Sequence, residues 1–183
     1  MDSKAAVKRR LIIDTAKLII HEKGITALTL DAVAKQADIS KGGLLYHYPS
    51  KEALIKGIAV SIFEDLDTAL TEYAENDLVE KGKWARAMIE VTRDDLNHRA
   101  ELNVAVMASS LLDEDVAENI SNSYQRALIK LDNDGIPPVT TAVIRLALDG
   151  LYYSQMLSVA PLDKKMQREV LDQLLIMTRK GDV

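Results

Sequence analysis

The chain has 183 residues, 48% of them hydrophobic, with a mean hydropathy near zero and no cysteine. These values exclude a compositionally disordered chain, a disulfide framework and any cysteine-based zinc cluster or nucleophile. The net charge of −5 is uneven, because residues 1–60 carry ten Lys/Arg and six Asp/Glu, whereas the remainder carries 13 and 22. Chance scatter of surface charge is one explanation. The other, which we favour, is that only the N-terminal third faces a polyanion.

The N-terminal sequence predicts neither a leader nor a membrane segment. MDSKAAVKRR is charged, and the apolar run after it is interrupted by Asp14 and Lys17. No apolar stretch approaches roughly 18 residues, the length expected of a spanning helix. We therefore expect no signal peptide, no membrane contact and a cytoplasmic location.

Helical periodicity of apolar residues runs through the whole chain, and no segment alternates strictly enough to be a strand. We predict an all-α fold of about nine helices. The predicted helices cover residues 4–23, 30–37, 40–48, 51–73, 83–98, 100–112, 114–132, 139–159 and 163–180.

Capping residues define the ends of the first four helices. Gly24 stands where a helix C-cap is expected. Thr29, Ser40 and Ser50 offer N-cap hydroxyls to the second, third and fourth helices. Pro49 stops the third helix.

The third predicted helix breaks several rules of helix stability. Lys41 occupies its first turn, where an acidic residue would suit the helix dipole. Gly42 and Gly43 follow, each costing roughly 1 kcal/mol relative to alanine. Bare backbone at a helix N-terminus lets an anion approach the free N–H groups closely, and Tyr46 and His47 carry polar tips that could reach phosphates. The pattern favours nucleic-acid contact, although the glycines could instead permit close helix crossing.

The second and third helices are joined by Asp38-Ile39-Ser40 and so form a predicted helix-turn-helix. In that motif the second helix enters the major groove N-terminus first. We expect Tyr48 to pack beneath the helix rather than to contact DNA.

The segment TLDAVAKQADISKGGLLYHYPSKEAL, from Thr29 to Leu54, resembles the signature of the TetR family of bacterial transcriptional regulators, and the match extends over about residues 5–58. The resemblance implies a DNA-binding domain at 1–50 and a ligand-binding and dimerisation domain at 51–183, with 51–75 as the linking helix. The candidate DNA-contacting residues are Thr29, Ser40, Lys41, Gly42, Gly43, Leu45, Tyr46, His47 and Lys51.

Three residues depart from the usual family pattern. Asp38 stands where the turn commonly has glycine, and Gly43 replaces a common Thr, Ala or Ser. Leu45 occupies a position where a base-reading aromatic is frequent, and its side chain could instead meet a thymine methyl. These departures bear on the operator sequence and not on DNA binding itself.

By the same resemblance, the C-terminal helices should hold a ligand chamber. Adaptable Met side chains and a few polar aromatics suit an apolar small molecule. Each candidate, taken alone, is also typical of ordinary helical core. The candidate wall residues are Phe63, Leu66, Trp84, Met88, Val91, Met107, Leu111, Tyr124, Tyr152 and Met156.

We expect a homodimer formed through helices 139–159 and 163–180, which would make a four-helix interface. An intramolecular core face is the alternative use of the same residues. The residues that suggest the interface are Val143, Leu146, Ala147, Gly150, Leu151, Ser154, Val170, Leu174 and Met177.

The function predicted is a ligand-responsive transcriptional regulator, most simply a repressor, that binds a palindromic double-stranded DNA operator and is released by a small-molecule effector. A DNA-binding head on a protein-interaction module is the main alternative. A metal-dependent helical enzyme is more remote, because Asp95-Leu96-Asn97-His98 is the single carboxylate-x-x-His match in the chain. We predict no catalytic residue, no metal ligand and no cofactor.

Overall fold

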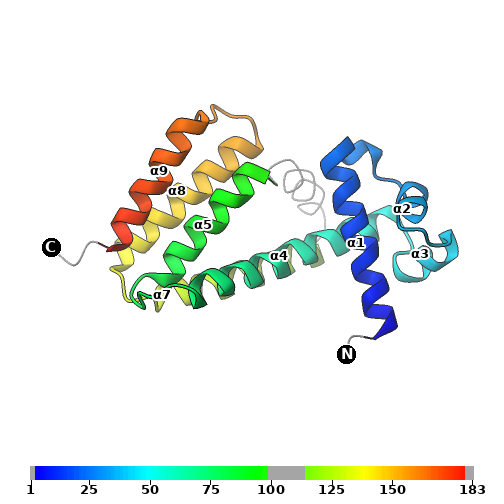
Figure 1. Ribbon diagram of the computed structural model, residues 1–183, viewed down its shortest axis with the longest axis horizontal. Helices are drawn as coiled ribbons and strands as arrows, with labels where there is room; N and C mark the ends of the chain where they lie inside the picture. Colours follow the sequence, from blue (N-terminus) through cyan, green and yellow to red (C-terminus); the bar gives the residue numbers. More distant parts are fainter. Residues whose placement is uncertain (1–2, 99–113, 180–183) are drawn as a thin grey trace. The chain divides into compact units, whose positions relative to one another are not determined.

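The computed structural model describes residues 3–98 and 114–179 (Figure 1). All regular structure in these ranges is helical, which confirms the all-α fold class. The predicted helix over 100–112 lies outside the described residues. The helices are α1 Lys4–Lys23, the 3-10 helix η1 Ile25–Ala27, α2 Leu30–Gln36, α3 Lys41–His47, α4 Lys51–Glu75, α5 Lys83–His98, α7 Glu114–Asp132, α8 Pro138–Met156 and α9 Lys164–Arg179.

The bounds of α1, α5 and α7 match the predicted ranges, whereas α8 ends three residues earlier than expected. The reason is local: Ser158 and Ala160 have positive φ values of 53° and 45°, which cannot continue a right-handed helix. Neither residue is a glycine, so the composition gave no sign of this helix end. The short turn η1 was not predicted either.

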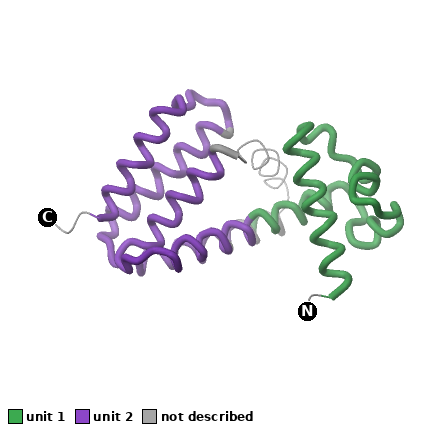
Figure 2. Tube along the Cα trace, in the orientation of Figure 1, with its two compact units in different colours: residues 1–62, 101–120 green, residues 63–100, 121–183 purple. Residues whose placement is uncertain are grey.

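The described residues divide into two compact units, coloured separately in Figure 2: unit 1 contains residues 3–62 and 114–120, and unit 2 contains residues 63–98 and 121–179. In unit 1, α1 packs on α2 and α2 packs on α3, and the first half of α4 completes the core. Its centre consists of fully buried aliphatic side chains at helical spacing. They are Ile12, Ala16, Ile19, Ile20, Leu28, Val33, Leu44, Leu54 and Ile58.

Unit 2 is a helical bundle in which α5 packs against both α8 and α9, with the second half of α4 and the end of α7 contributing to the same core. Its buried residues include Leu70, Ala85, Ile89, Ile144, Leu148, Leu151, Leu171 and Leu174. Leu151 and Leu174 were predicted at a dimer interface, but both belong to this internal core. In residues 3–98 and 114–179, no helix is both long enough and apolar enough to cross a bilayer.

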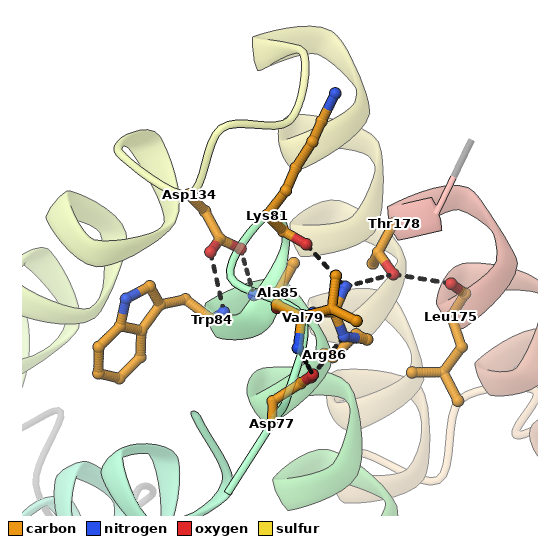
Figure 3. A network of polar contacts seen from close by, with 9 residues as sticks. All are labelled: Asp77, Val79, Lys81, Trp84, Ala85, Arg86, Asp134, Leu175 and Thr178. Carbon is orange, nitrogen blue, oxygen red and sulfur yellow. Dashed lines mark hydrogen bonds and ion pairs between the residues drawn. The ribbon is translucent and has the colours of Figure 1, made fainter. Parts of the chain in front are cut away.

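A buried arginine organises the loop between α4 and α5 (Figure 3). Arg86 is only 5% exposed. Its guanidinium donates to Asp77 at 2.5 Å, and to the backbone carbonyls of Val79 and Lys81 at 2.5 and 2.9 Å. A longer contact of 3.5 Å reaches the Thr178 hydroxyl on α9. The hydrogen bond from Arg86 holds the pKa of the Asp77 carboxyl below its usual value.

Asp134, between α7 and α8, caps α5 from fifty residues away. Its carboxylate accepts the backbone N–H groups of Trp84 and Ala85 at 3.0 and 2.7 Å (Figure 3). Its carbonyl accepts the N–H of Gly82 at 2.8 Å. Burial raises the pKa of Asp134, and these backbone donors oppose the shift by stabilising the charged form.

Candidate nucleic-acid interface

Two capping hydroxyls set the ends of the helices in the α2–α3 motif. Thr29 Oγ1 accepts the N–H of Ala32 at 3.1 Å, and Ser40 Oγ accepts the N–H of Gly43 at 3.1 Å. A hydroxyl that accepts a backbone hydrogen bond keeps its own O–H to donate. Both side chains are exposed, so they can cap their helices and donate to a phosphate oxygen at the same time.

The turn between α2 and α3 contains a residue in the left-handed region. Asp38 has a φ of 52°, and the next residue, Ile39, donates its N–H to the carbonyl of Ala34 at 3.0 Å. Glycine adopts this conformation without cost, and aspartate is one of the few other residues that visit it routinely. The departure at Asp38 is therefore compatible with an unchanged turn.

The predicted contact residues on α3 differ widely in exposure. Tyr46 is 83% exposed, an unusual value for a tyrosine, and its ring meets that of His47 edge-on with centroids 5.1 Å apart. Leu45 and His47 are half-buried. Lys41 is exposed and forms an ion pair with Asp31 of α2 at 2.9 Å. Lys51, half-buried, opens α4 directly after Ser50, whose hydroxyl caps that helix.

The two glycines of α3 have different surroundings. A methyl group added to Gly42 would meet no other atom within 4 Å. A methyl group on Gly43 would lie 3.1 Å from Ser40 Oγ and 3.9 Å from Lys8 Nζ. Lys8 of α1 thus lies beside α3, the second helix of the helix-turn-helix and therefore its recognition helix, although Lys8 was not among the predicted contacts. The basic run Lys8-Arg9-Arg10 is the feature of the sequence that could have indicated Lys8 as a contact.

Tyr48 is packed in the core, as predicted, and the structure places its ring against α4. It is 6% exposed, and its ring lies over Gly57 of α4. A methyl group on Gly57 would lie 2.6 Å from Tyr48 Cε1 and 3.0 Å from Ile13 Cδ1. The guanidinium of Arg9, on α1, lies 5.7 Å from the centroid of the Tyr48 ring. The position of the recognition helix therefore depends on a glycine at 57.

Replacing Gly57 by alanine should destabilise the protein by about 1–3 kcal/mol, because the rigid tyrosine ring must move. The same replacement at Gly42 should stabilise α3 by up to about 1 kcal/mol, since its methyl group enters open space. Urea denaturation of both variants measures the difference. Equal stabilisation by the two substitutions would show that Tyr48 does not seat α3 in this way.

Five of the ten predicted ligand-wall residues lie in or against the core of unit 2. Met88 and Val91 are buried there, and Leu66, Trp84 and Tyr152 pack against it. Phe63 and Tyr124 are half-buried. Met107 and Leu111 lie outside the described residues, as does the side chain of Met156.

Three polar contacts near these residues were not predicted from the sequence. The hydroxyl of Tyr124 on α7 donates to the carboxylate of Asp149 on α8, and burial raises the pKa of Tyr124. Lys130 Nζ lies 4.6 Å from the centroid of the Trp84 ring and forms an ion pair with Asp67. Across the described ranges, no group of three or more His, Cys, Asp or Glu side chains is arranged to hold a metal ion.

Comparison with known proteins gives two domain matches. Residues 12–58 match the model of bacterial regulatory proteins of the tetR family, and residues 82–179 match the tetracyclin repressor-like C-terminal domain. The chain is 31% identical over 128 residues to the HTH-type transcriptional regulator UidR of Escherichia coli strain K12, an alignment that covers 68% of this chain. The matched region spans 62% of the length of UidR.

Solved structures share the fold. Salmonella enterica GusR superposes with a TM-score of 0.62 at 21% identity, covering 97% of this chain and 98% of GusR. The multidrug binding protein EbrR complexed with ethidium superposes with a TM-score of 0.64 at 21% identity, covering 91% of this chain and 98% of EbrR.

The short capped helices α2 and α3 form a helix-turn-helix, and they precede the helical bundle of unit 2 in the sequence. The class is therefore a helix-turn-helix protein with a separate helical body. The two domain matches, of which the C-terminal one alone covers more than half of the chain, are more specific. The chain belongs to the TetR family of bacterial regulatory proteins.

Proposed function

We propose that this protein is a cytoplasmic transcriptional repressor that binds a palindromic operator as a homodimer and is released by a small, largely apolar effector. The observation that carries the proposal is the exposed face of α3. There Tyr46 projects into solvent beside His47, and Gly42 leaves the backbone open. These groups serve no core, and they lie on the helix that a helix-turn-helix inserts into the major groove.

An unpaired apolar stripe on α8 supports the homodimer. The inner face of α8 is buried in unit 2, yet its outer face leaves large apolar side chains exposed at alternating intervals of four and three residues, with Gly150 among them. A contiguous exposed stripe of this kind is typical of a protein interface. The stripe consists of Val139, Val143, Leu146, Gly150, Tyr153 and Leu157.

The continuity of α4 supports effector control. This one helix contributes Leu54 and Ile58 to the core of unit 1 and Leu70 and Ala74 to the core of unit 2. An effector that displaces the second half of α4 would therefore change the setting of the recognition helix. Coupling of this kind is typically worth about 1–3 kcal/mol and is reciprocal, so operator DNA must weaken effector binding by the same factor. The EbrR structure with bound ethidium shows an organic ligand in a protein of this fold.

Two lysine variants test the DNA-binding part of the proposal, on a duplex that the wild-type protein selects from a random pool. Lys41→Ala should cost about 1–3 kcal/mol on the selected duplex and relax its sequence preference. Lys51→Ala should weaken binding to all duplexes alike and reduce the salt slope by about one. Equal losses on selected and random DNA for Lys41→Ala would contradict a base-reading role.

A further inference from the structure

The ion pair between α2 and α3 involves the first residue of the recognition helix. Lys41 Nζ lies 2.9 Å from Asp31 Oδ1 and 3.2 Å from Asp31 Oδ2. The two side chains remain 59% and 72% exposed. Both carboxylate oxygens of Asp31 thus engage one ammonium group on the face of the motif that carries the candidate DNA contacts.

Folding stability does not explain this pair. Exposed ion pairs contribute little, because solvent screens them and two long side chains lose freedom. Asp31 suits the first turn of α2, where a negative charge meets the positive end of the helix dipole. Lys41 lies in the first turn of α3, where a positive charge is unfavourable. The lysine is better explained by what it contacts outside the protein.

The pairing also limits what Lys41 can bind. An ammonium group has three N–H donors and no acceptor. With at least one donor directed at the Asp31 carboxylate, no more than two remain, which suffice for a base acceptor such as guanine O6 or N7. A phosphate would have to compete with the carboxylate for the same ammonium group.

We propose that Asp31 is a positioning residue that withholds Lys41 from backbone phosphates and directs it toward a base edge, thereby raising the ratio of operator affinity to random-DNA affinity. This inference rests on the proposed DNA-binding function and adds a specificity device to it. Random DNA offers Lys41 chiefly phosphates, and phosphate contacts dominate non-specific binding. Asp31 therefore weakens random-DNA binding more than operator binding.

The test is a double-mutant cycle with wild type, Asp31→Asn, Lys41→Ala and the double variant. Each protein is titrated against a random-sequence 30-bp duplex and against the duplex that wild type selects, over a salt series. We expect Asp31→Asn to tighten random-DNA binding several-fold and to steepen its salt slope by about 0.9, the increment of one added phosphate contact. On the selected duplex the gain should be smaller, so the specificity ratio falls.

The Lys41→Ala background separates positioning from simple repulsion. If Asp31 acts through Lys41, Asp31→Asn should change neither affinity nor salt slope in that background. An equal effect in both backgrounds would overturn the inference, because Asp31 would then merely repel DNA. The absence of any effect in the wild-type background would overturn it as well.

Asp14→Asn is the matched control, since it makes the same charge change at an exposed position on α1 in the same unit. It should leave the salt slope on random DNA unchanged, and an equal steepening would overturn the inference. Thermal denaturation of each variant verifies folding. If wild type selects no duplex from the pool, the proposed function fails. If it selects one and Asp31→Asn behaves as wild type, the inference alone fails.

Discussion

The Leu146→Arg variant is expected to remain folded but to become monomeric, and to lose about 10²–10⁴-fold of its operator affinity. That range is the gain in affinity that linking two binding modules typically provides. Leu146 is 60% exposed at the middle of the α8 stripe, so arginine there creates no clash within the protomer. In a dimer the stripe would meet its own copy, and two guanidinium groups would be buried without partners.

Ile129→Arg is the matched control for Leu146→Arg. Ile129 is an equally exposed aliphatic residue, 62% accessible, but it lies on α7 and outside the stripe. Sedimentation equilibrium and operator titration of the two variants give the comparison. A Leu146→Arg protein that remains dimeric, or an Ile129→Arg protein that dissociates to the same extent, would show that the α8 stripe is not the interface.

Arg86→Met should destabilise the protein by up to about 3 kcal/mol, the lower end of the cost of breaking a buried ion pair, because the Asp77 carboxylate that loses its partner is only half-buried. Methionine fills much of the arginine volume, but it removes the guanidinium donor from the carbonyls of Val79 and Lys81 and from the Asp77 carboxylate, which keeps only the N–H of Val79. Urea denaturation at neutral pH measures the loss. Arg168→Met, at an exposed position on α9, is the control and should change stability by less than about 0.5 kcal/mol.

The pH dependence of stability gives a second measure of the same site. Because the pKa of Asp77 is lower in the folded protein than in the unfolded chain, its ionised form stabilises the fold above the unfolded pKa. That stabilisation disappears as the pH falls through the folded pKa. Wild type should therefore lose more stability than Arg86→Met between neutral and strongly acidic pH. Parallel losses in the two proteins would contradict the assigned role of Arg86.

The sequence was most informative where structure depends on neighbouring residues. Thr29, Ser40 and Ser50 were recognised as N-caps because a capping hydroxyl bonds an N–H only three residues away. Gly24 was recognised as a C-cap because its φ of 78° is easily adopted by glycine.

Contacts between distant residues could not be read from such patterns. Asp134 looked like a turn residue, yet it caps a helix fifty positions earlier in the chain. Arg86 looked like one more charged residue on an amphipathic helix, although it is buried. Leu151 and Leu174 are apolar residues at helical spacing, which suits a dimer interface and an internal core equally well. Periodicity alone cannot distinguish an interface residue from a core residue. Asp31 and Lys41 lie ten positions apart, so their pairing depends on how α2 and α3 pack.

The central claim is that unit 1 presents a sequence-reading helix to DNA. The most direct test is binding of the purified protein to the DNA immediately upstream of its own gene, against random DNA of equal length, over a salt series. A symmetrically protected site bound at least about 10³-fold more tightly than random DNA is the predicted result. The contradicting result is weak binding with the same affinity and salt dependence on the upstream DNA and on random DNA, together with no preference for sequences selected from a random pool.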